Sequence, residues 1–266
     1  MLYFGSFNPI HRGHIALAEY AIEHSLCDKV VLVVSPQNPH KPSSELAPEF
    51  ERFEMAERAC KASKYPEKIA PSVVEFMLPR PSYTIDTLRY LKENFSDRME
   101  LSILMGCDLI NTMDRWKEPE AILENFPIYV YPRSGYELEK FADRVDYLAD
   151  APLCNFSSTE VRRAVERGEN TSSMITKEVA DHIREKGLYT TASRIVSLTQ
   201  LIESEGESAE ALLERGVCYY RSGEWGRALN DFRRVLELEP ENVEAKEFTS
   251  MTQEILSYRY TDIYNP

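Results

Sequence analysis

The sequence predicts an α/β fold with a Rossmann-like, doubly wound parallel sheet, followed by a small all-α C-terminal extension. Short continuous apolar runs alternate with amphipathic helical patterns over residues 1–190, and no strand-like run appears in residues 191–266. Apolar runs bounded by turns are typical of parallel strands that are covered on both faces. Their alternation with helices indicates a parallel sheet between two helical layers. We therefore expect an α/β domain that carries the candidate site over residues 1–190 and a helical domain over residues 191–266.

The elements of the first domain follow in order. A short run at 1–4 precedes Gly5, and the longer apolar runs are at 30–35, 101–106 and 126–131. Helical patterns cover the ranges 14–24, 48–62, 84–94, 118–125, 159–167 and 177–186. The first run is shorter than the ~5–6 residues usual for a strand, so we expect the natural start to lie upstream of Met1. In doubly wound sheets, ligands bind at the carboxyl ends of the strands, so the segments that follow these runs are the candidate site.

The tail carries one repeat pattern. Residues 209–245 resemble a 34-residue tetratricopeptide repeat, with the matching positions Gly216, Tyr219, Gly223, Ala228, Phe232 and Pro240. Candidate helices at 192–204 and 243–257 flank it, and Arg215 stands where leucine is usual. Gly216 and Ala228 predict a close helix approach, with Tyr219 and Phe232 filling the interface. Because a lone repeat cannot bury its own apolar face, we expect it to pack on the first domain, on a second copy in a homo-oligomer, or on a protein partner.

Composition excludes several classes of protein. The net charge is −13, from 31 Lys and Arg against 44 Asp and Glu, which argues against nucleic-acid binding. The five cysteines are scattered and form no CxxC pair, which predicts free thiols in a reducing compartment. No apolar run approaches the ~20 residues that span a bilayer, so neither a membrane role nor a signal peptide is expected. The expected location is the cytoplasm.

The stretch GSFNPIHRGH (5–14) is the first candidate site. A strand, a turn and then a helix present free backbone N–H groups and the positive end of a helix at the carboxyl edge. Gly5 has no Cβ, so a phosphate could approach the backbone, and His11 and His14 could point to one side. The alternative is a helix capped by serine and asparagine, with solvated histidines. A protein-held metal is not expected, since only His24, His40 and His182 remain and no cysteine pair completes a site.

Two further segments could bind phosphate. In NFSSTEVRRAV (155–165), Ser157 and Glu160 predict a capping box, and Arg162 in the first turn would add a cation to a helix N-terminus. The alternative is a capped helix with surface arginines. Lys41 lies in a loop directly after the run at 30–35, where it is either a phosphate partner or an ordinary surface lysine.

Individually weak segments at the other strand ends complete a family pattern. These are RPSYTIDTL (80–88), GCDLINTMDRW (106–116), YPRSGY (131–136) and VADHIREKGLY (179–189). Together with GSFNPIHRGH, NPHK and SSTEVRRAV, they resemble, in order and spacing, the nicotinate-nucleotide adenylyltransferases of the HxGH nucleotidylyltransferase superfamily. This chain departs from the pattern at Phe4, at Lys117 and in the RPSYT loop, which lacks the glycine and proline often found there.

The resemblance implies a reaction and a set of roles. ATP and nicotinate mononucleotide would give deamido-NAD and pyrophosphate by direct in-line attack, without a covalent intermediate. His11, His14, Lys41 and Arg162 would be the catalytic residues. The implied ATP contacts are Gly5, Ser6, Phe7, Asn8, Gly106, Asp108, Arg133, Ser157, Ser158 and Thr159. Tyr83 and Thr84 would bind the nicotinate carboxylate, and Trp116 would stack on the pyridine ring.

The resemblance also implies Mg²⁺, held mainly by the ATP phosphates and water. Two alternatives remain open from the sequence. One is an adenylyltransferase for another acceptor, either nicotinamide mononucleotide or phosphopantetheine. The other is a non-catalytic nucleotide-binding scaffold that acts through its helical tail. Intact histidines, lysine and arginine argue against the second.

Overall fold

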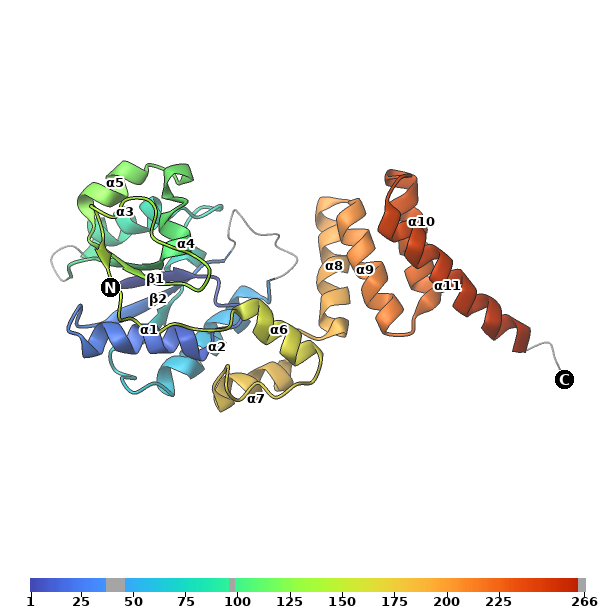
Figure 1. The fold of residues 1–266 in the computed structure, drawn as a ribbon, viewed down its shortest axis with the longest axis horizontal. Coiled ribbons are helices and arrows are strands. Elements are labelled where there is room, and N and C mark those ends of the chain that lie inside the picture. The colour runs from blue at the N-terminus through green and yellow to red at the C-terminus, as the bar shows by residue number, and fades with distance from the viewer. Residues whose placement is uncertain (37–45, 96–98, 263–266) are drawn as a thin grey trace. The chain divides into compact units, whose positions relative to one another are not determined.

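The computed structural model describes residues 1–36, 46–95 and 99–262, with side chains described to residue 257. The chain divides into two compact units, Met1–Lys186 and Gly187–Pro266, and each is considered by itself. This division lies within a few residues of the domain boundary placed at residue 190 from the sequence. The first unit contains the sheet, and the second contains only helices in its described part (Figure 1).

The first unit is built on a six-stranded parallel sheet, which confirms the predicted fold class. The strands are β1 (Leu2–Gly5), β2 (Val30–Val34), β3 (Ile69–Ser72), β4 (Ile103–Gly106), β5 (Ile128–Tyr131) and β6 (Asp146–Tyr147). Their order is β3-β2-β1-β4-β5-β6, and every neighbouring pair is parallel. The sequence did not predict β3, which contains Pro71, or β6, which has two exposed residues, because neither forms a continuous apolar run.

Helices cover both faces of this sheet, with α1 and α2 on one face and α3, α4 and α5 on the other (Figure 1). The helices are α1 (Arg12–Glu23), α2 (Glu49–Lys61), α3 (Thr84–Phe95), α4 (Cys107–Ile110), α5 (Pro119–Asn125), α6 (Ser158–Glu166) and α7 (Lys177–Lys186). The six predicted helices are confirmed to within a few residues, and the predicted stripe of Ile15, Ala18 and Ile22 is buried. The one-turn helix α4 and the 3₁₀ turns at Val74–Met77 and Met113–Arg115 were too short to show a period. Among the described helices, none has the length and apolarity to cross a membrane.

The strand order shows where along the sheet a ligand would bind. It reverses between β1 and β4, which pair at Leu2–Ile103 and Tyr3–Leu104. At such a reversal, the connections leave neighbouring strands in opposite directions and open a crevice at their carboxyl ends. The segments that follow Gly5 and Gly106 therefore lie at the position where a doubly wound sheet binds its ligand.

The second unit consists of four helices in its described residues. They are α8 (Thr191–Glu205), α9 (Ala209–Arg221), α10 (Trp225–Leu238) and α11 (Val243–Asp262). The predicted close approach is confirmed, because a Cβ on Gly216 would lie 2.6 Å from the ring of Phe232. Phe232 is fully buried, but Tyr219 is only partly buried, beside the guanidinium groups of Arg215 and Arg227. Tyr219 therefore does not fill the helix interface in the way that the sequence predicted.

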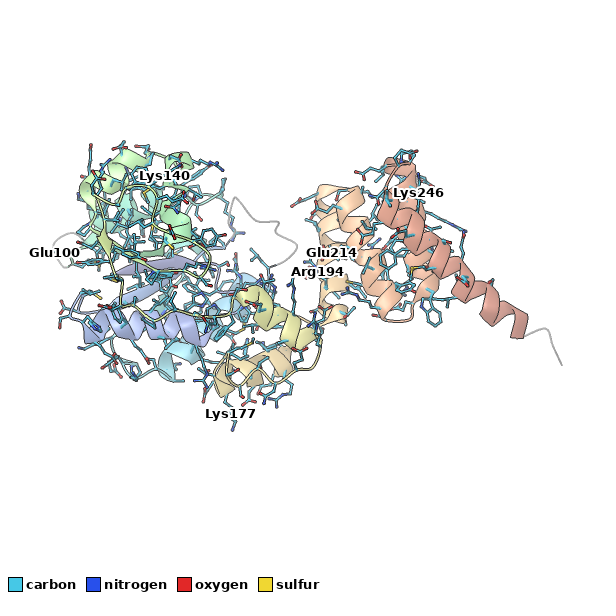
Figure 2. The ribbon with its side chains drawn as sticks, viewed as in Figure 1. Glu100, Lys140, Lys177, Arg194, Glu214 and Lys246 are labelled. Atoms are coloured by element: carbon cyan, nitrogen blue, oxygen red, sulfur yellow. The ribbon has the colours of Figure 1, made fainter. Side chains whose placement is uncertain are left out.

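The flanking helices cover much of the repeat. Phe232 on α10 stacks on Phe248 of α11, with 5.2 Å between the ring centroids. On the other side, Arg194 of α8 forms an ion pair with Glu214 of α9 (Figure 2). The repeat therefore buries apolar surface within its own unit, since α8 and α11 take the places that neighbouring repeats occupy in longer arrays. An additional partner for this unit stays a prediction.

Candidate active site

Two stacked histidines open α1. His11 is the N-cap residue, which contradicts the alternative in which serine and asparagine cap this helix. The rings of His11 and His14 lie 3.6 Å apart between centroids at an interplanar angle of 24°. The backbone N–H of His11 donates to Nδ1 of His14 over 3.1 Å. Because a backbone N–H can only donate, Nδ1 of His14 is unprotonated and its Nε2 carries the proton.

These histidines line a pocket beside β1 and β5. Its other lining residues are Tyr3, Gly13, Leu17, Tyr131, Pro132, Arg133, Pro152, Cys154 and Phe156. The hydroxyls of Tyr3 and Tyr131 share a buried hydrogen bond of 2.9 Å. Arg133 contributes a cation to the pocket wall, beside the carboxylate of Asp108, in a protein that is acidic as a whole. A cation at the wall of the pocket is suited to contact with an anionic small molecule.

His11 is held neutral at physiological pH. Its side chain is buried, and its pKa is lowered from 6.5 to about 4, first by burial and then by the charge of Arg133. Its Nδ1 is buried without a full hydrogen bond among the described residues, and the His11 side chain faces the backbone N–H of His14 in a capping box. The backbone N–H of His14 therefore supplies a weak partner for a ring nitrogen that would otherwise be costly to bury.

The start of α6 lies against the loop that follows β1. The predicted capping box is confirmed, with Ser157 and Glu160 bonding reciprocally. Ser158 Oγ donates to the carbonyl of Pro9 over 2.9 Å, and Arg162 Nη1 donates to the carbonyl of Asn8, also over 2.9 Å. Segments about 150 residues apart in sequence are thereby joined at one site.

The position of Arg162 corrects one detail of the sequence analysis. Because α6 begins at Ser158, Arg162 lies in the second helical turn and not in the first. From there its Nη2 also donates to Thr159 Oγ1, at 3.3 Å. Its side chain reaches back along the helix, and its guanidinium still lies at the helix start.

A carboxylate follows β4 at the same edge. Asp108 Oδ2 lies 3.4 Å from Nε of Arg133, while Oδ1 is buried and has no hydrogen-bond partner among the described residues. A Cβ on Gly106 would collide with Oδ1 of Asp108, so any larger residue here would displace this carboxylate oxygen. The end of β4 therefore holds an acceptor whose hydrogen-bonding capacity is not satisfied by the described protein groups.

The loop after β1 owes its shape to its own side chains. Phe7 adopts a positive φ of 44°, and its ring is buried against Tyr3 and His14. A Cβ on Gly5 would lie 3.1 Å from this ring, so the glycine is needed for Phe7 as well as for an approaching ligand. Asn8 is buried too, and its Oδ1 accepts a hydrogen bond from the backbone of Ala47. The side chains of Phe7 and Asn8 are thus structural, which leaves the backbone of this loop for ligand contact.

Tyr83, Thr84 and Trp116 form a second group. Thr84 begins α3, and the partly exposed ring of Tyr83 lies 5.1 Å from Nζ of Lys117. Lys117 in turn forms an ion pair of 2.9 Å with Asp86. Trp116 is partly buried and packs against the apolar core that carries β1 and β4. Among the described residues, the hydrogen bonds, ion pairs and ring contacts of Tyr83, Thr84 and Trp116 are to residues outside the histidine pocket. Lys41 lies outside the described residues.

The sequence analysis missed Arg52. Its guanidinium is completely buried and donates to four backbone carbonyls: those of Ser6, Ser35, Pro36 and Ala47, at 2.6–2.9 Å. It thereby ties the loop after β1 to the segment after β2. A signal was present in the sequence, since Arg52, Met55, Ala56 and Ala59 share one helix face, and an arginine on an apolar stripe indicates a buried polar network.

The glycine between the two histidines was also missed. A Cβ on Gly13 would collide with Sγ and Cβ of Cys154, which lies in the segment before α6. The same segment places the ring of Phe156 edge-on to His11, with 5.3 Å between centroids. Gly13 therefore lets the start of α1 and this segment enclose the histidines together.

Comparison with known proteins agrees with this geometry. Residues 2–164 match the cytidylyltransferase-like family model, and residues 209–242 match a tetratricopeptide repeat model. A nicotinate-nucleotide adenylyltransferase of Christiangramia forsetii is 37% identical over 191 residues, covering 71% of this chain and 96% of that relative. One from Bacteroides fragilis is 40% identical over 170 residues, covering 64% and 83%.

A solved structure shows the same fold. The Plasmodium falciparum nicotinic acid mononucleotide adenylyltransferase, complexed with NaAD, matches with a TM-score of 0.59 at 19% identity, over 71% of this chain and 95% of that one. At this identity the match concerns the fold alone. By its family-model match and its curated relatives, the chain belongs to the cytidylyltransferase-like family and, within it, to the nicotinate-nucleotide adenylyltransferases.

Proposed function

We propose that the protein transfers the adenylyl group of ATP to nicotinate mononucleotide, which gives deamido-NAD and pyrophosphate in NAD biosynthesis. The observation that carries this proposal is the stacked pair His11 and His14 at the carboxyl end of β1, where the strand order reverses. The relatives named for this reaction support the acceptor. They do not favour nicotinamide mononucleotide, phosphopantetheine or a non-catalytic scaffold.

The reaction requires positioning and charge neutralisation, with no protein nucleophile. The phosphate of the mononucleotide attacks the α-phosphorus of ATP, and pyrophosphate leaves on the opposite side. His14 would donate from its protonated Nε2 to the phosphate oxygens, and the ring of His11, stacked on His14, would contact them as well. Charge that develops on these oxygens in the transition state would strengthen both contacts.

The remaining ATP contacts would come from the loop and from α6. The backbone of Gly5, Ser6, Phe7 and Asn8 would hold the α-phosphate region. Lys41 and Arg162, with Ser157, Ser158 and Thr159, would neutralise the departing pyrophosphate at a helix N-terminus. The hydrogen bonds of Ser158 and Arg162 to this loop support their place beside the phosphates.

The nucleoside would lie at the end of β4. The buried Oδ1 of Asp108 can accept a hydrogen bond from a ribose hydroxyl, beside Gly106, where a Cβ would displace this oxygen. Arg133, which contacts Asp108 and lines the pocket, would lie by the adenine.

The acceptor would bind at the second group. Tyr83 and Thr84 would donate to the nicotinate carboxylate, and Trp116 would stack on the pyridinium ring. Lys117, which is already close to Tyr83, adds a cation near that carboxylate.

Mg²⁺ would enter with ATP. The described residues of the histidine pocket include no carboxylate, and Oδ2 of Asp108 is already beside Arg133. These residues fit a metal held by phosphate oxygens and water, which is the usual mode for Mg²⁺. When bound, it would offset the phosphate charge. Turnover should disappear in excess EDTA and return when Mg²⁺ is restored.

One assay tests the proposal directly. Pyrophosphate release would be measured from ATP with nicotinate mononucleotide, nicotinamide mononucleotide and phosphopantetheine in parallel. We expect release with the first acceptor at a kcat/KM at least about tenfold above the others. Equal rates with the three acceptors would contradict a preference for nicotinate mononucleotide. The absence of pyrophosphate release with all three would favour the non-catalytic scaffold.

The pKa of His11 predicts a dependence of stability on pH. Because the folded pKa is about 4 and the unfolded value is 6.5, the unfolded chain binds more protons at this residue between these pH values. The free energy of unfolding should therefore fall as pH drops from 6.5 towards 4, by on the order of 3 kcal/mol from this residue. Urea titrations of wild type and His11→Asn across this range would measure it. His24→Asn, at an exposed histidine near the end of the same helix, should keep the wild-type slope.

Trp116→Ala should act on the acceptor. Loss of the stacking surface should raise the KM for nicotinate mononucleotide by about tenfold, with the KM for ATP nearly unchanged. Trp116→Phe retains an aromatic face and controls for lost packing against the core. A rise confined to the KM for ATP would place Trp116 elsewhere in the site.

The helical unit would mediate self-association or bind a partner. Its match to a tetratricopeptide repeat supports a role in protein contact. A chain ending at residue 190 would be compared with the full chain by analytical ultracentrifugation, thermal unfolding and turnover. If oligomeric state, stability and activity were all unchanged, self-association would be ruled out, and binding to a separate protein would be the better explanation for this unit.

A further inference from the structure

A histidine and two glutamates meet between α2 and α7, on elements that the proposed reaction does not use. His182 of α7 is completely buried, with Glu51 and Glu54 of α2 on either side of its ring. One potential ligand atom from each of the three residues lies within 4.8 Å of the other two. In the sequence, His182 is only one of three remaining histidines, with no cysteine pair to complete a metal site.

The two ring nitrogens of His182 have different surroundings. Nε2 lies 2.7 Å from Oε2 of Glu51, a hydrogen bond in which the ring nitrogen donates to the carboxylate. The other oxygen of Glu51 lies 3.2 Å from Nζ of Lys186, so both oxygens of this carboxylate are engaged. This arrangement places the proton of a neutral imidazole on Nε2 and leaves a lone pair on Nδ1.

Nδ1 faces a second acceptor. It is buried without a hydrogen-bond partner among the described residues, and it lies 3.6 Å from Oε2 of Glu54. Two lone-pair atoms that face each other repel, and 3.6 Å is too long for a hydrogen bond from a proton on Nδ1, so the gap fits a metal ion better than a proton. The distance suits a zinc-sized ion, because bonds of about 2.1 Å to each atom would meet at an angle of about 120°.

We propose that Nδ1 of His182 and the carboxylate of Glu54 bind a divalent transition-metal ion of the Zn²⁺ type, with water completing its coordination. Glu51 is the orienting residue, since metal-binding histidines usually donate their second ring N–H to a carboxylate. An imidazole–carboxylate pair favours zinc and its neighbours over Mg²⁺ or Ca²⁺. The ion joins α7, the last helix of the first unit, to α2, the helix that carries Arg52.

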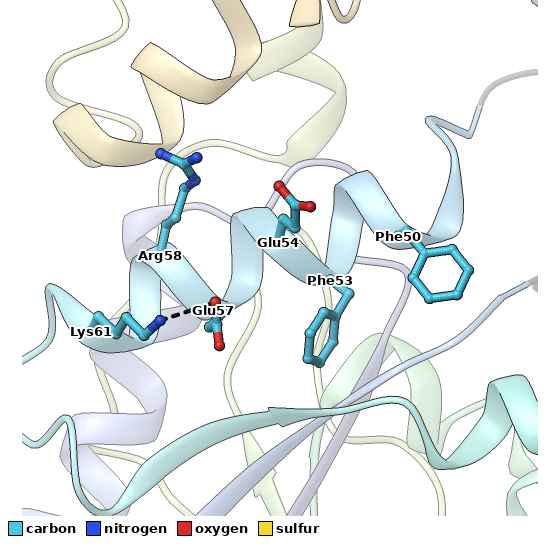
Figure 3. Close-up of a pocket in the computed structure, with 6 residues that line it drawn as sticks. All are labelled: Phe50, Phe53, Glu54, Glu57, Arg58 and Lys61. Atoms are coloured by element: carbon cyan, nitrogen blue, oxygen red, sulfur yellow. Dashed lines mark ion pairs between the residues drawn. The ribbon is translucent and has the colours of Figure 1, made fainter. Parts of the chain in front are cut away.

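The surroundings of Glu54 allow a ligand to enter. Glu54 is about half exposed, and Figure 3 shows it on the same side of α2 as Arg58, with Glu57 directed away. Within the described chain, no ion pair joins Arg58 to Glu54, whereas Glu57 is paired with Lys61 at 3.0 Å. Glu57 therefore provides a matched control: it is a glutamate on the same helix, of similar exposure, and among the described residues it forms no ion pair with His182.

The test uses the EDTA-treated full chain with reduced thiols. Zn²⁺ affinity would be measured by calorimetry and the thermal midpoint with and without Zn²⁺, for wild type, Glu54→Gln, Glu51→Gln and Glu57→Gln. We expect wild type and Glu57→Gln to bind one ion with equal affinity and to be stabilised by it. Glu54→Gln should bind at least about tenfold more weakly, and Glu51→Gln about 10- to 100-fold more weakly.

Co²⁺ substitution distinguishes this site from the five thiols. The visible bands of nitrogen- and oxygen-bound Co²⁺ should appear without a thiolate charge-transfer band, and they should be lost in Glu54→Gln. Glu54 is at the surface, so this variant tests the proposal even if His182→Asn fails to fold. Equal Zn²⁺ affinity in wild type and Glu54→Gln, or no Zn²⁺-dependent rise in the thermal midpoint, would overturn the proposal. Neither result depends on which acceptor the enzyme uses.

Discussion

His14→Ala is expected to lower kcat by about 100- to 1,000-fold, with smaller changes in both KM values. The Nε2 proton of His14 is fixed by the hydrogen bond that Nδ1 accepts from the backbone of His11. This donor would be most valuable when charge builds up on the α-phosphate oxygens, so its loss should reduce kcat more than substrate binding. Steady-state pyrophosphate release at saturating ATP and nicotinate mononucleotide measures the effect.

Two conservative variants separate this chemistry from structure. His14→Asn retains an acceptor near the position of Nδ1 and should preserve the start of α1, but kcat should stay low. His14→Gln can place a donor nearer to Nε2 and should recover part of the rate. A near-normal kcat in His14→Asn would contradict the assigned role, because it would show that only the helix start depends on His14.

Arg52→Met is expected to lower the free energy of unfolding of the first unit by about 3–5 kcal/mol. The methionine fills much of the same volume, but it leaves the carbonyls of Ser6, Ser35, Pro36 and Ala47 without their donor. Because Ser6 belongs to the loop proposed to hold the α-phosphate, turnover of the folded fraction should fall as well. The buried guanidinium is thus a positioning residue, which acts through the backbone it holds.

The two tryptophans allow the change in unfolding free energy to be assigned to the first unit. Trp116 lies in the first unit and Trp225 in the second, so a Trp225→Phe background leaves a reporter for the first unit alone. Urea unfolding of Arg52→Met and Arg52→Lys would be followed in this background. Lysine should rescue only partly, since it lacks the planar fork of donors. Arg58→Met, at a partly exposed arginine of the same helix, should cost less than about 1 kcal/mol. An Arg52→Met variant as stable as wild type would refute this role.

The sequence predicted the fold well because the central strands and the longer helices carry strong periodic patterns. The runs at 30–35, 101–106 and 126–131 became β2, β4 and β5, and the six helical patterns of the first unit became helices. β3 and β6 were missed, because an edge strand has fewer apolar residues to bury and so lacks a continuous run. Tyr219 was placed too deep, because the repeat pattern shows Arg215 but does not show that the guanidinium groups of Arg215 and Arg227 lie beside the tyrosine ring.

The site was predicted in part. The motifs GSFNPIHRGH and SSTEVRR indicated a phosphate site, and the structure brings them together through the hydrogen bonds of Ser158 and Arg162. The roles of Tyr83, Thr84 and Trp116 stay predictions, since among the described residues their hydrogen bonds, ion pairs and ring contacts are to residues outside the histidine pocket. Arg52 and Gly13 were missed because their partners, backbone carbonyls and Cys154, are remote in sequence.

The sequence by itself determined the α/β fold class, the repeat in the tail and the residue types at the strand ends, since these depend on local periodicity and spacing. Only the tertiary structure decided the stacking of His11 on His14, the neutral state of His11, the open acceptor of Asp108 and the meeting of His182 with Glu54. The physical reason is that burial and hydrogen-bond satisfaction are set by residues far apart in the chain. A pattern shows which side chains are present, and packing determines which of their atoms lack a partner.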